Sequence, residues 1–473
     1  MSNPVIKPLV GLAIIGALGV GLPWVIGRKI ETDVRAAIAA APDHYPYPVS
    51  LVRYERGLFS SVAETQQRFD LGPDPDEITI DDDGKAVLPP NRIVPLTLLH
   101  RISHGPRPDG LRLARFVNTV KLDGDWRDAA RRLFGDAEPV TLTVDLGLAG
   151  GVRGELVSPA IDTQLPPDDE DDQEDARHLQ WSGIRGQFSK SGPRLVGMLD
   201  APGLRIDEDA LVVGPATINA DLTAIADGIW AGTFSSRLET VRTEGQEGAA
   251  SLKGIRLDAD TVETNGKLTS TTTMAVDELL LDDVKVSDAR LRMVLDRLGT
   301  QSLSELSRAL NRYTAQHNGK PVDGDEARRM LAAIQPSLAA AAAEQPIFAI
   351  EDLSFTAPQG KLQLRGKVQY VGDGNLDDFS VAGDVAADLS LEAPVALIDL
   401  LLRQQAAKAK IPGPDGEPGS LHPDQIAASA QASRDDAVNK GLLTLDGDRA
   451  STAITYKDGA LTINGKTLGA PTH

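Results

Sequence analysis

Two pairs of residues could together support nucleophilic chemistry. Ser60 and Ser61 end the stretch YERGLFSS (54–61), and His100 and His104 follow in LLHRISHGPRP. A histidine within hydrogen-bond reach of a serine can act as its general base. A catalytic serine commonly sits on a strained elbow of the pattern G-x-S-x-G, which does not occur in this sequence. A hydrolase that uses these serines and histidines is therefore the least favoured function.

A simple turn explains the same stretch. Apolar residues flank Arg56-Gly57 on both sides, which predicts a hairpin that turns at Gly57. His100 and His104 have the spacing of two metal ligands on one helix, but no H-E-x-x-H motif is present. Gly105-Pro106 would end a helix there, so SHGPRP is expected to be a turn after a strand. We expect no catalytic residue and no metal site.

Two further stretches resemble ligand-binding loops only in part. DDDGK (81–85) begins like a calcium loop but lacks the distal glutamate that the loop requires. The glycine-rich GALGVG (16–21) lies inside an uncharged apolar run, without the strand and helix of a nucleotide-binding motif. No cofactor is expected.

Composition limits the partners more than the fold. The 473 residues include 48 Lys and Arg against 68 Asp and Glu, which gives a net charge of −20. Such a charge repels polyanions, so nucleic-acid binding is not expected. Aromatic residues make up only 4% of the chain, so its cores must be mainly aliphatic, and the absence of cysteine excludes disulfides.

The N-terminus predicts one membrane anchor. Residues 8–27 carry no charge, and Arg28-Lys29 follow them directly. Their helical length matches the roughly 30 Å hydrocarbon core of a bilayer, and Trp24 lies where an indole favours the interface. A signal peptide cleaved near AIAAA (37–41) is the alternative, but the apolar run is longer than is typical of one. We expect an uncleaved signal anchor with the rest of the chain exported; a row of small residues in this run would permit a homodimer, namely Ala13, Ala17 and Gly21.

Alternating apolar and polar residues predict antiparallel strands through most of the chain. PVTLTVDLGL (139–148) and GKLQLRGKVQY (360–370) each place their apolar residues on one face. Lys457-Asp458-Gly459 predicts a tight hairpin, because Asp-Gly readily adopts positive φ. The expected fold is mainly β with helical insertions (α+β), built from meandering antiparallel sheets that are elongated or curved.

Helices are expected in three places. The sequence predicts two helices within 302–345, with Pro336 kinking or dividing the second, and another helix in APVALIDLLLRQQAAKAK (393–410). The expected organisation is an anchor at 1–28, a β-rich region at 29–298, a helical hairpin at 299–346, and a β-rich C-terminal region with helices at 347–473.

Four motifs in a fixed order resemble the YdgA-like family of bacterial inner-membrane proteins: GRKIE (27–31), YERGLFSS (54–61), SHGP (103–106) and ITYKDGALTINGK (454–466). The resemblance implies an N-terminal anchor and a β-rich body in the periplasm of a Gram-negative bacterium, and it transfers no catalytic residues. It marks the following residues as structural: Tyr54, Arg56, Gly57, Phe59, Ser60, His104, Gly105, Pro106, Asp458, Gly459, Asn464 and Gly465.

The expected function is therefore that of a non-enzymatic envelope protein, a scaffold or a binding protein with a lipid or an envelope protein as partner. A more specific alternative is a lipid or apolar-ligand handling protein, because curved aliphatic sheets are similar in pattern to AsmA-like envelope proteins. In that case the Leu and Val faces would line a groove instead of a sealed core.

Overall fold

The computed structural model describes residues 23–41, 48–74, 79–80, 86–87, 89–105, 112–165, 177–207, 211–245, 248–281, 284–317, 324–376, 378–407, 410–412, 418–420 and 422–468. The chain forms two compact units. Unit 1 contains Met1–Asp207, Pro215–Gly232 and Leu303–Leu338, and unit 2 contains Glu208–Gly214, Thr233–Ser302 and Ala339–His473. Each unit is described by itself.

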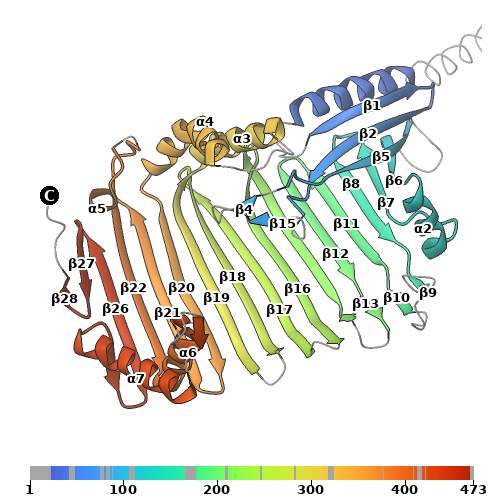
Figure 1. Cartoon of the computed structure of the whole chain (residues 1–473). Helices are drawn as coiled ribbons and strands as arrows, with labels where there is room; N and C mark the ends of the chain where they lie inside the picture. Colours follow the sequence, from blue (N-terminus) through green and yellow to red (C-terminus); the bar gives the residue numbers. More distant parts are fainter. Residues whose placement is uncertain are drawn as a thin grey trace, which may run out of the picture. The chain divides into compact units, whose positions relative to one another are not determined.

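Unit 1 begins with a helix over residues 23–41 that lies against the first strands (Figure 1). Every strand pair in the meander that follows is antiparallel, in the spatial order β1, β2, β5, β6, β7, β8, β11, β12 and β15. The bounds are β1 Val49–Arg56, β2 Ser60–Asp70, β5 Ile93–His104, β6 Arg112–Lys121, β7 Thr141–Gly147, β8 Val152–Ser158, β11 Ile184–Ser191, β12 Arg194–Ala201 and β15 Ala216–Ala226.

Shorter strands complete unit 1. β10 (Arg177–Trp181) pairs with β9 (Ile161–Leu165) and with β13 (Leu204–Ile206), and β3 (Thr79–Ile80) pairs with β4 (Ala86–Val87). The acidic run at 166–175 lies outside the described residues, as does DDDGK (81–85).

The core of unit 1 forms under the N-terminal helix. Ile30 of this helix packs with Ala63, Ile102 and Ala114 from three different strands, and flanking apolar residues close around them. The helix therefore covers the apolar face of the sheet at β2, β5 and β6.

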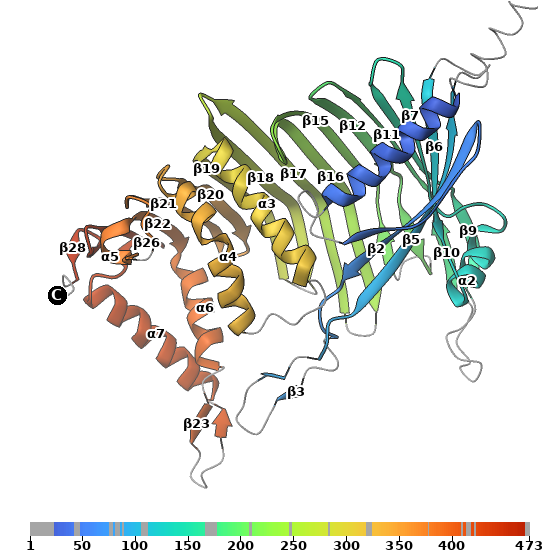
Figure 2. The same cartoon turned by 90° about the horizontal axis from the view of Figure 1, so that it is seen from above.

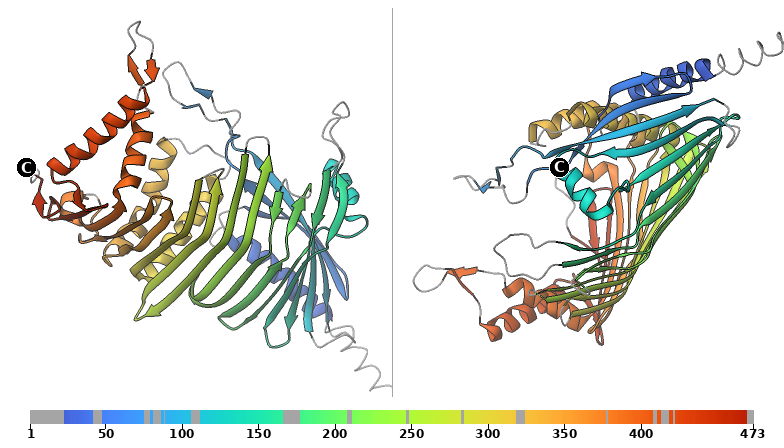
Figure 3. Two further views of the ribbon diagram at one scale, coloured as in Figure 1. Left: turned by 90° about the horizontal axis from the view of Figure 1, so that it is seen from below. Right: turned by 90° about the vertical axis from the view of Figure 1, so that its right-hand side faces the viewer.

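Unit 2 is a second antiparallel meander. β17 to β22 follow one another in chain order, β22 then pairs with β26, and the chain ends in β27 and β28. The strands of this meander twist progressively (Figure 3). The bounds are β14 Leu211–Val213, β16 Ile229–Gly245, β17 Gly248–Thr264, β18 Lys267–Leu281, β19 Val284–Gly299, β20 Ile347–Ala357, β21 Gly360–Tyr370, β22 Val385–Pro394, β23 Lys410–Pro412, β24 Pro418–Ser420, β25 Thr444–Asp446, β26 Arg449–Lys457, β27 Ala460–Ile463 and β28 Lys466–Thr467.

Helices interrupt the strands at the predicted places and at others. α3 (Thr300–His317) and α4 (Gly324–Ala342) occupy the predicted helical segment, and α4 continues through Pro336 without dividing. α6 (Val395–Ala407) is the third predicted helix, and it lies beside α7 (Pro423–Asn439) in Figure 2. Neither α7 nor α2 (Asp125–Phe134) was predicted, and α5 (Val381–Asp384) is a single turn.

The structure confirms a mainly β fold with antiparallel pairing and helical insertions. The predicted alternation in 360–370 is the strand β21, and that in 139–148 contains β7. In β19 the apolar positions change from even (Val284, Val286) to odd (Leu291, Met293). Asp288 lies between them with a φ of 52°, beside a register shift against β20, so a bulge accounts for the change.

Candidate functional site

Three of the four motifs meet at one end of unit 1. GRKIE lies on the N-terminal helix, YERGLFSS forms the turn between β1 and β2, and SHGP ends β5. The β1–β2 turn closes with a hydrogen bond from the Gly57 amide to the Ser60 carbonyl, 2.7 Å. A β-carbon at Gly57 would lie 2.8 Å from that same carbonyl oxygen, so the turn requires glycine.

The pairing of β2 with β5 brings one candidate serine to one candidate histidine. Ser61 Oγ lies 3.2 Å from His104 Nε2, and these two residues are 2% and 1% exposed. Ser60 points to the other face and is exposed. Of the serine–histidine combinations that the sequence allowed, the structure therefore brings together Ser61 and His104.

The N-terminal helix seals this pair. A β-carbon on Gly27 would lie 2.6 Å from Cε1 of His104, so the helix backbone packs directly on the imidazole. Pro23 packs in the same way on Gly105, whose φ is 90°. A substrate could reach Ser61 Oγ only if this helix moved away from the sheet.

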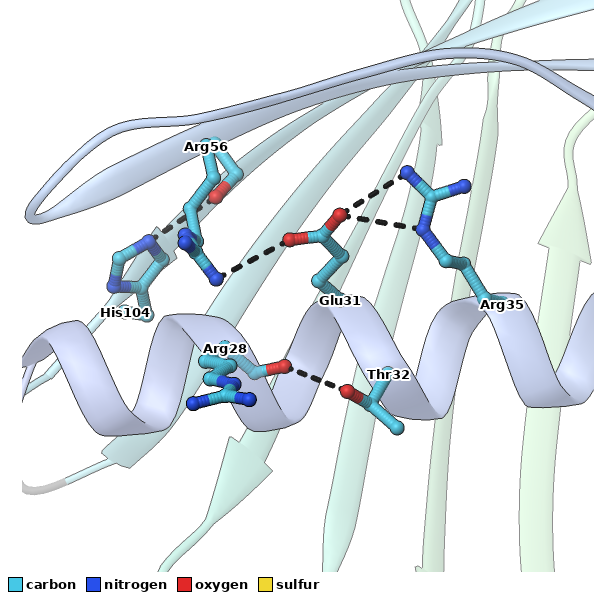
Figure 4. Close-up of polar contacts among 7 residues, drawn as sticks. Arg28, Glu31, Thr32, Arg35, Arg56 and His104 are labelled. Atoms are coloured by element: carbon cyan, nitrogen blue, oxygen red, sulfur yellow. Dashed lines mark hydrogen bonds and ion pairs between the residues drawn. The ribbon is translucent and has the colours of Figure 1, made fainter.

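Charged side chains fasten the helix to the hairpin. Glu31 accepts hydrogen bonds from Arg35 at 3.0 and 3.2 Å and forms an ion pair of 3.3 Å with Arg56 (Figure 4). The Arg35 guanidinium also lies over the Tyr54 ring, 5.8 Å from its centroid. Burial raises the pKa of the Tyr54 phenol; the Ser61 hydroxyl opposes this shift and the Glu31 carboxylate adds to it.

His100 belongs to a different network on the same strand. Its Nε2 lies 2.7 Å from Thr65 Oγ1, and its Nδ1 lies 2.7 Å from Asn118 Oδ1. The Asn118 amide in turn donates to the Leu142 carbonyl at 2.8 Å. Four strand residues span roughly 13 Å, so the two histidines cannot share a metal ion.

The fourth motif forms two consecutive turns in unit 2. Asp458-Gly459 joins β26 to β27, and Asn464-Gly465 joins β27 to β28. All four residues have positive φ, between 49° and 78°, as a type I′ hairpin turn requires. Asn464 also accepts a hydrogen bond from the Ala453 amide at 2.8 Å and donates one to the Gly441 carbonyl at 3.0 Å.

The Phe59 side chain in the β1–β2 turn is 47% exposed. Pro106 lies outside the described residues.

A ladder of aliphatic side chains crosses unit 2. Six residues in direct register on six adjacent strands form it, and we call them the aliphatic ladder: Leu257, Met274, Leu291, Leu353, Leu364 and Leu391. The residues next to them point to the opposite face and are polar: Asp258, Thr273, Arg292, Asp352, Arg365 and Ser390. One face of this sheet is therefore aliphatic and the other polar.

The described part of unit 2 does not bury this aliphatic face. None of the six ladder residues is buried, and a parallel row beside them includes Leu295, Phe348 and Val368, which are 41%, 38% and 45% exposed. The α6 helix covers only one end, where Leu397 is buried together with Ala393 at the end of β22. Leu401 on α6 is 50% exposed, so the neighbouring described residues do not cover this helix fully.

The predicted membrane span is largely outside what the structure describes. Residues 8–22 are not described, including Ala13, Ala17 and Gly21, and residues 23–27 are the first turn of the helix that packs on unit 1. In the described ranges, no helix is both long and apolar enough to cross a bilayer.

A family model described as a bacterial protein of unknown function (DUF945) matches residues 6–470. The chain belongs to this family. No curated protein matches the chain. The DUF945 match covers both units and all four motifs, so the contacts of GRKIE, YERGLFSS and SHGP lie within the family domain.

The GRKIE motif of this DUF945 chain was identified from the sequence, but two of its residues were not predicted to make contacts. Gly27 and Glu31 begin and end GRKIE, and they are the residues that touch His104 and Arg56. Their spacing of four puts both on one side of a helix, which is a signal that the sequence contains.

Proposed function

We propose that this protein is a non-enzymatic, YdgA-like envelope protein, anchored in the inner membrane with its body in the periplasm, that binds lipid acyl chains on the aliphatic face of unit 2. The observation that carries the proposal is the aliphatic ladder, none of whose residues is buried and which unit 2 covers only in part. Soluble proteins rarely expose a continuous apolar surface without a ligand or partner for it.

The dimensions of the ladder suit an acyl chain. Six strands at a spacing of about 4.8 Å give it a length of roughly 24 Å. That exceeds the thickness of one hydrocarbon leaflet, about 15 Å, so an acyl chain laid across the strands would cover most of the ladder residues but not all of them.

The buried state of Ser61 and His104 supports the non-enzymatic part of the proposal. Both side chains lie under the N-terminal helix, and the hydrogen bond between them is a packing contact. The hydrolase hypothesis would need that helix to detach.

Photo-crosslinking in cells tests the lipid proposal. Benzoylphenylalanine placed at Leu364 of the full chain should yield lipid adducts by mass spectrometry, and the same group at Arg365 should not, because Arg365 lies on the polar face of the same strand. Protein adducts at Leu364 would favour the scaffold alternative. Equal lipid yields at both positions, or none at Leu364, would reject lipid binding on this face.

A further inference from the structure

Apolar side chains gather in the open at the end of unit 1 where its helix begins. Trp24 and Val25 on the first helical turn are 44% and 56% exposed, and Leu58 and Phe59 in the β1–β2 turn are also exposed. We call these four residues the Trp24–Phe59 patch. The turn closes through the Gly57 amide and the Ser60 carbonyl, and this closure does not itself require apolar residues at positions 58 and 59.

The two halves of the patch are held together. The Arg56 guanidinium stacks over the Trp24 ring, 5.5 Å from its centroid, and Arg28 approaches the same ring at 5.9 Å. Glu31 fixes Arg56 from the helix side at 3.3 Å (Figure 4). The hairpin tip therefore keeps its place beside the helix without needing a partner to order it.

The charge of this end differs from that of the chain. In helix 23–41 and turn 56–60 the basic residues outnumber the acidic Glu31 and Asp33, whereas the whole chain carries −20; the basic residues are Arg28, Lys29, Arg35 and Arg56. An indole beside guanidinium groups is typical of membrane interfaces, where Trp lies at headgroup level and Arg extends toward the headgroups. Phe and Leu are typical of the apolar face that interfacial elements insert.

The sequence that precedes Trp24 indicates what lies beside the Trp24–Phe59 patch. Residues 8–22 contain no charge and lead directly into Pro23, which is packed on Gly105. Because Pro23 and Gly27 are fixed to the sheet, a bilayer that holds the preceding residues lies beside Trp24 and the hairpin tip. We propose that the Trp24–Phe59 patch rests in the headgroup region of a lipid bilayer, so that the β1–β2 turn is a second membrane contact. This inference rests on the membrane anchoring in the proposed function.

The absence of cysteine from the chain makes a clean test available. Phe59→Cys in the full chain, labelled with a nitroxide and reconstituted into phosphatidylcholine and phosphatidylglycerol vesicles, reports collisions with oxygen and with a water-soluble nickel complex. Leu71→Cys, an exposed position of the same unit just after β2, at the opposite end of that strand from the β1–β2 turn, is the matched control. Leu58→Cys gives an independent second reading of the patch.

A label at position 59 buried about 5–10 Å into the headgroup boundary should show an oxygen-to-nickel collision ratio several-fold above that at position 71. Equal ratios at 58, 59 and 71 on chains that float with the vesicles would overturn this inference alone. Failure of the unlabelled chain to float with vesicles would overturn the anchor and this inference together, and the crosslinking at Leu364 would still judge lipid binding separately.

Discussion

Gly27 lies against the ring of His104, so close that a β-carbon at position 27 would come within 2.6 Å of Cε1. This contact joins the first motif of the chain to the third. The imidazole is itself enclosed by the sheet and has little room to move, so the helix can approach only where a side chain is missing.

Gly27→Ala should therefore lower the free energy of unfolding by about 1–3 kcal/mol, the usual cost of overpacking. Urea titrations of the detergent-solubilised chain measure it. Gly383→Ala is the control, because a β-carbon there meets no atom within 4 Å. Equal stability of the two variants would show that the helix does not pack on His104.

Ser61→Ala should lower the free energy of unfolding by about 1–3 kcal/mol, because it leaves the buried His104 without its hydroxyl partner. Ser60→Ala, at the exposed neighbour, should change it by less than about 0.5 kcal/mol. Both variants, expressed in a strain that lacks the gene, should return it to the wild-type phenotype. Loss of function in Ser61→Ala at unchanged stability would revive the hydrolase hypothesis.

Asp145 gives a pH dependence in the acid range. Its hydrogen bonds with Arg115 and Arg112 lower the pKa of the carboxyl from 3.8 to about 2, with Arg115 contributing most and partial burial opposing the shift. A depressed pKa contributes stability that is complete above the ordinary value and is lost as the pH falls toward the folded value.

Asp145→Asn should consequently be less stable than the wild type at pH 7, and the difference should shrink between pH 4 and pH 2. Urea unfolding at these pH values provides the comparison. Parallel pH profiles for the two proteins would mean that the arginine pair does not hold the carboxylate.

Asn464→Ala should lower the free energy of unfolding of unit 2 by about 2–4 kcal/mol, because it removes two side-chain hydrogen bonds and places alanine at a φ of 49°. Asn265→Ala separates these effects. Asn265 occupies the equivalent position of the β17–β18 turn with a φ of 54°, so its variant should show the backbone cost alone, about 1–2 kcal/mol. Equal losses would mean that the hydrogen bonds of Asn464 contribute nothing.

Local patterns predicted the strands well because each strand has one apolar face. Leu362, Leu364 and Val368 share a face as expected, and Asp458-Gly459 turns the chain as expected. The helix α7 was missed although Pro423 at its start and Gly441 after its end are ordinary boundary signals; its alanine- and serine-rich sequence has little amphipathic pattern.

The contacts of the motifs could not be read in the same way. Ser61 meets His104 only because β2 pairs with β5 in the register that sets Ser61 opposite Ile102. Alternation fixes which face a residue occupies but not its partner strand or register along it. Gly27 and His104 are separated in sequence by the whole β1–β2 hairpin, and rules based on local sequence do not predict contacts at such a separation.

The meander of unit 2 has a consequence for the order in which the polypeptide acquires structure. From β17 to β19, and again from β20 to β22, each strand pairs with the next strand of the chain, so these pairs can form as the chain emerges, with small loop-closure entropy. The helices α3 and α4 separate β19 from β20. The N-terminal helix is different, because the core in which Ile30 packs includes Ala114 of β6 and cannot form until β6 has been synthesised. The helix is synthesised before β6 and completes its packing only when Ala114, 84 residues after Ile30 (114 − 30), has appeared; until then its apolar side chains are exposed and can bind chaperones.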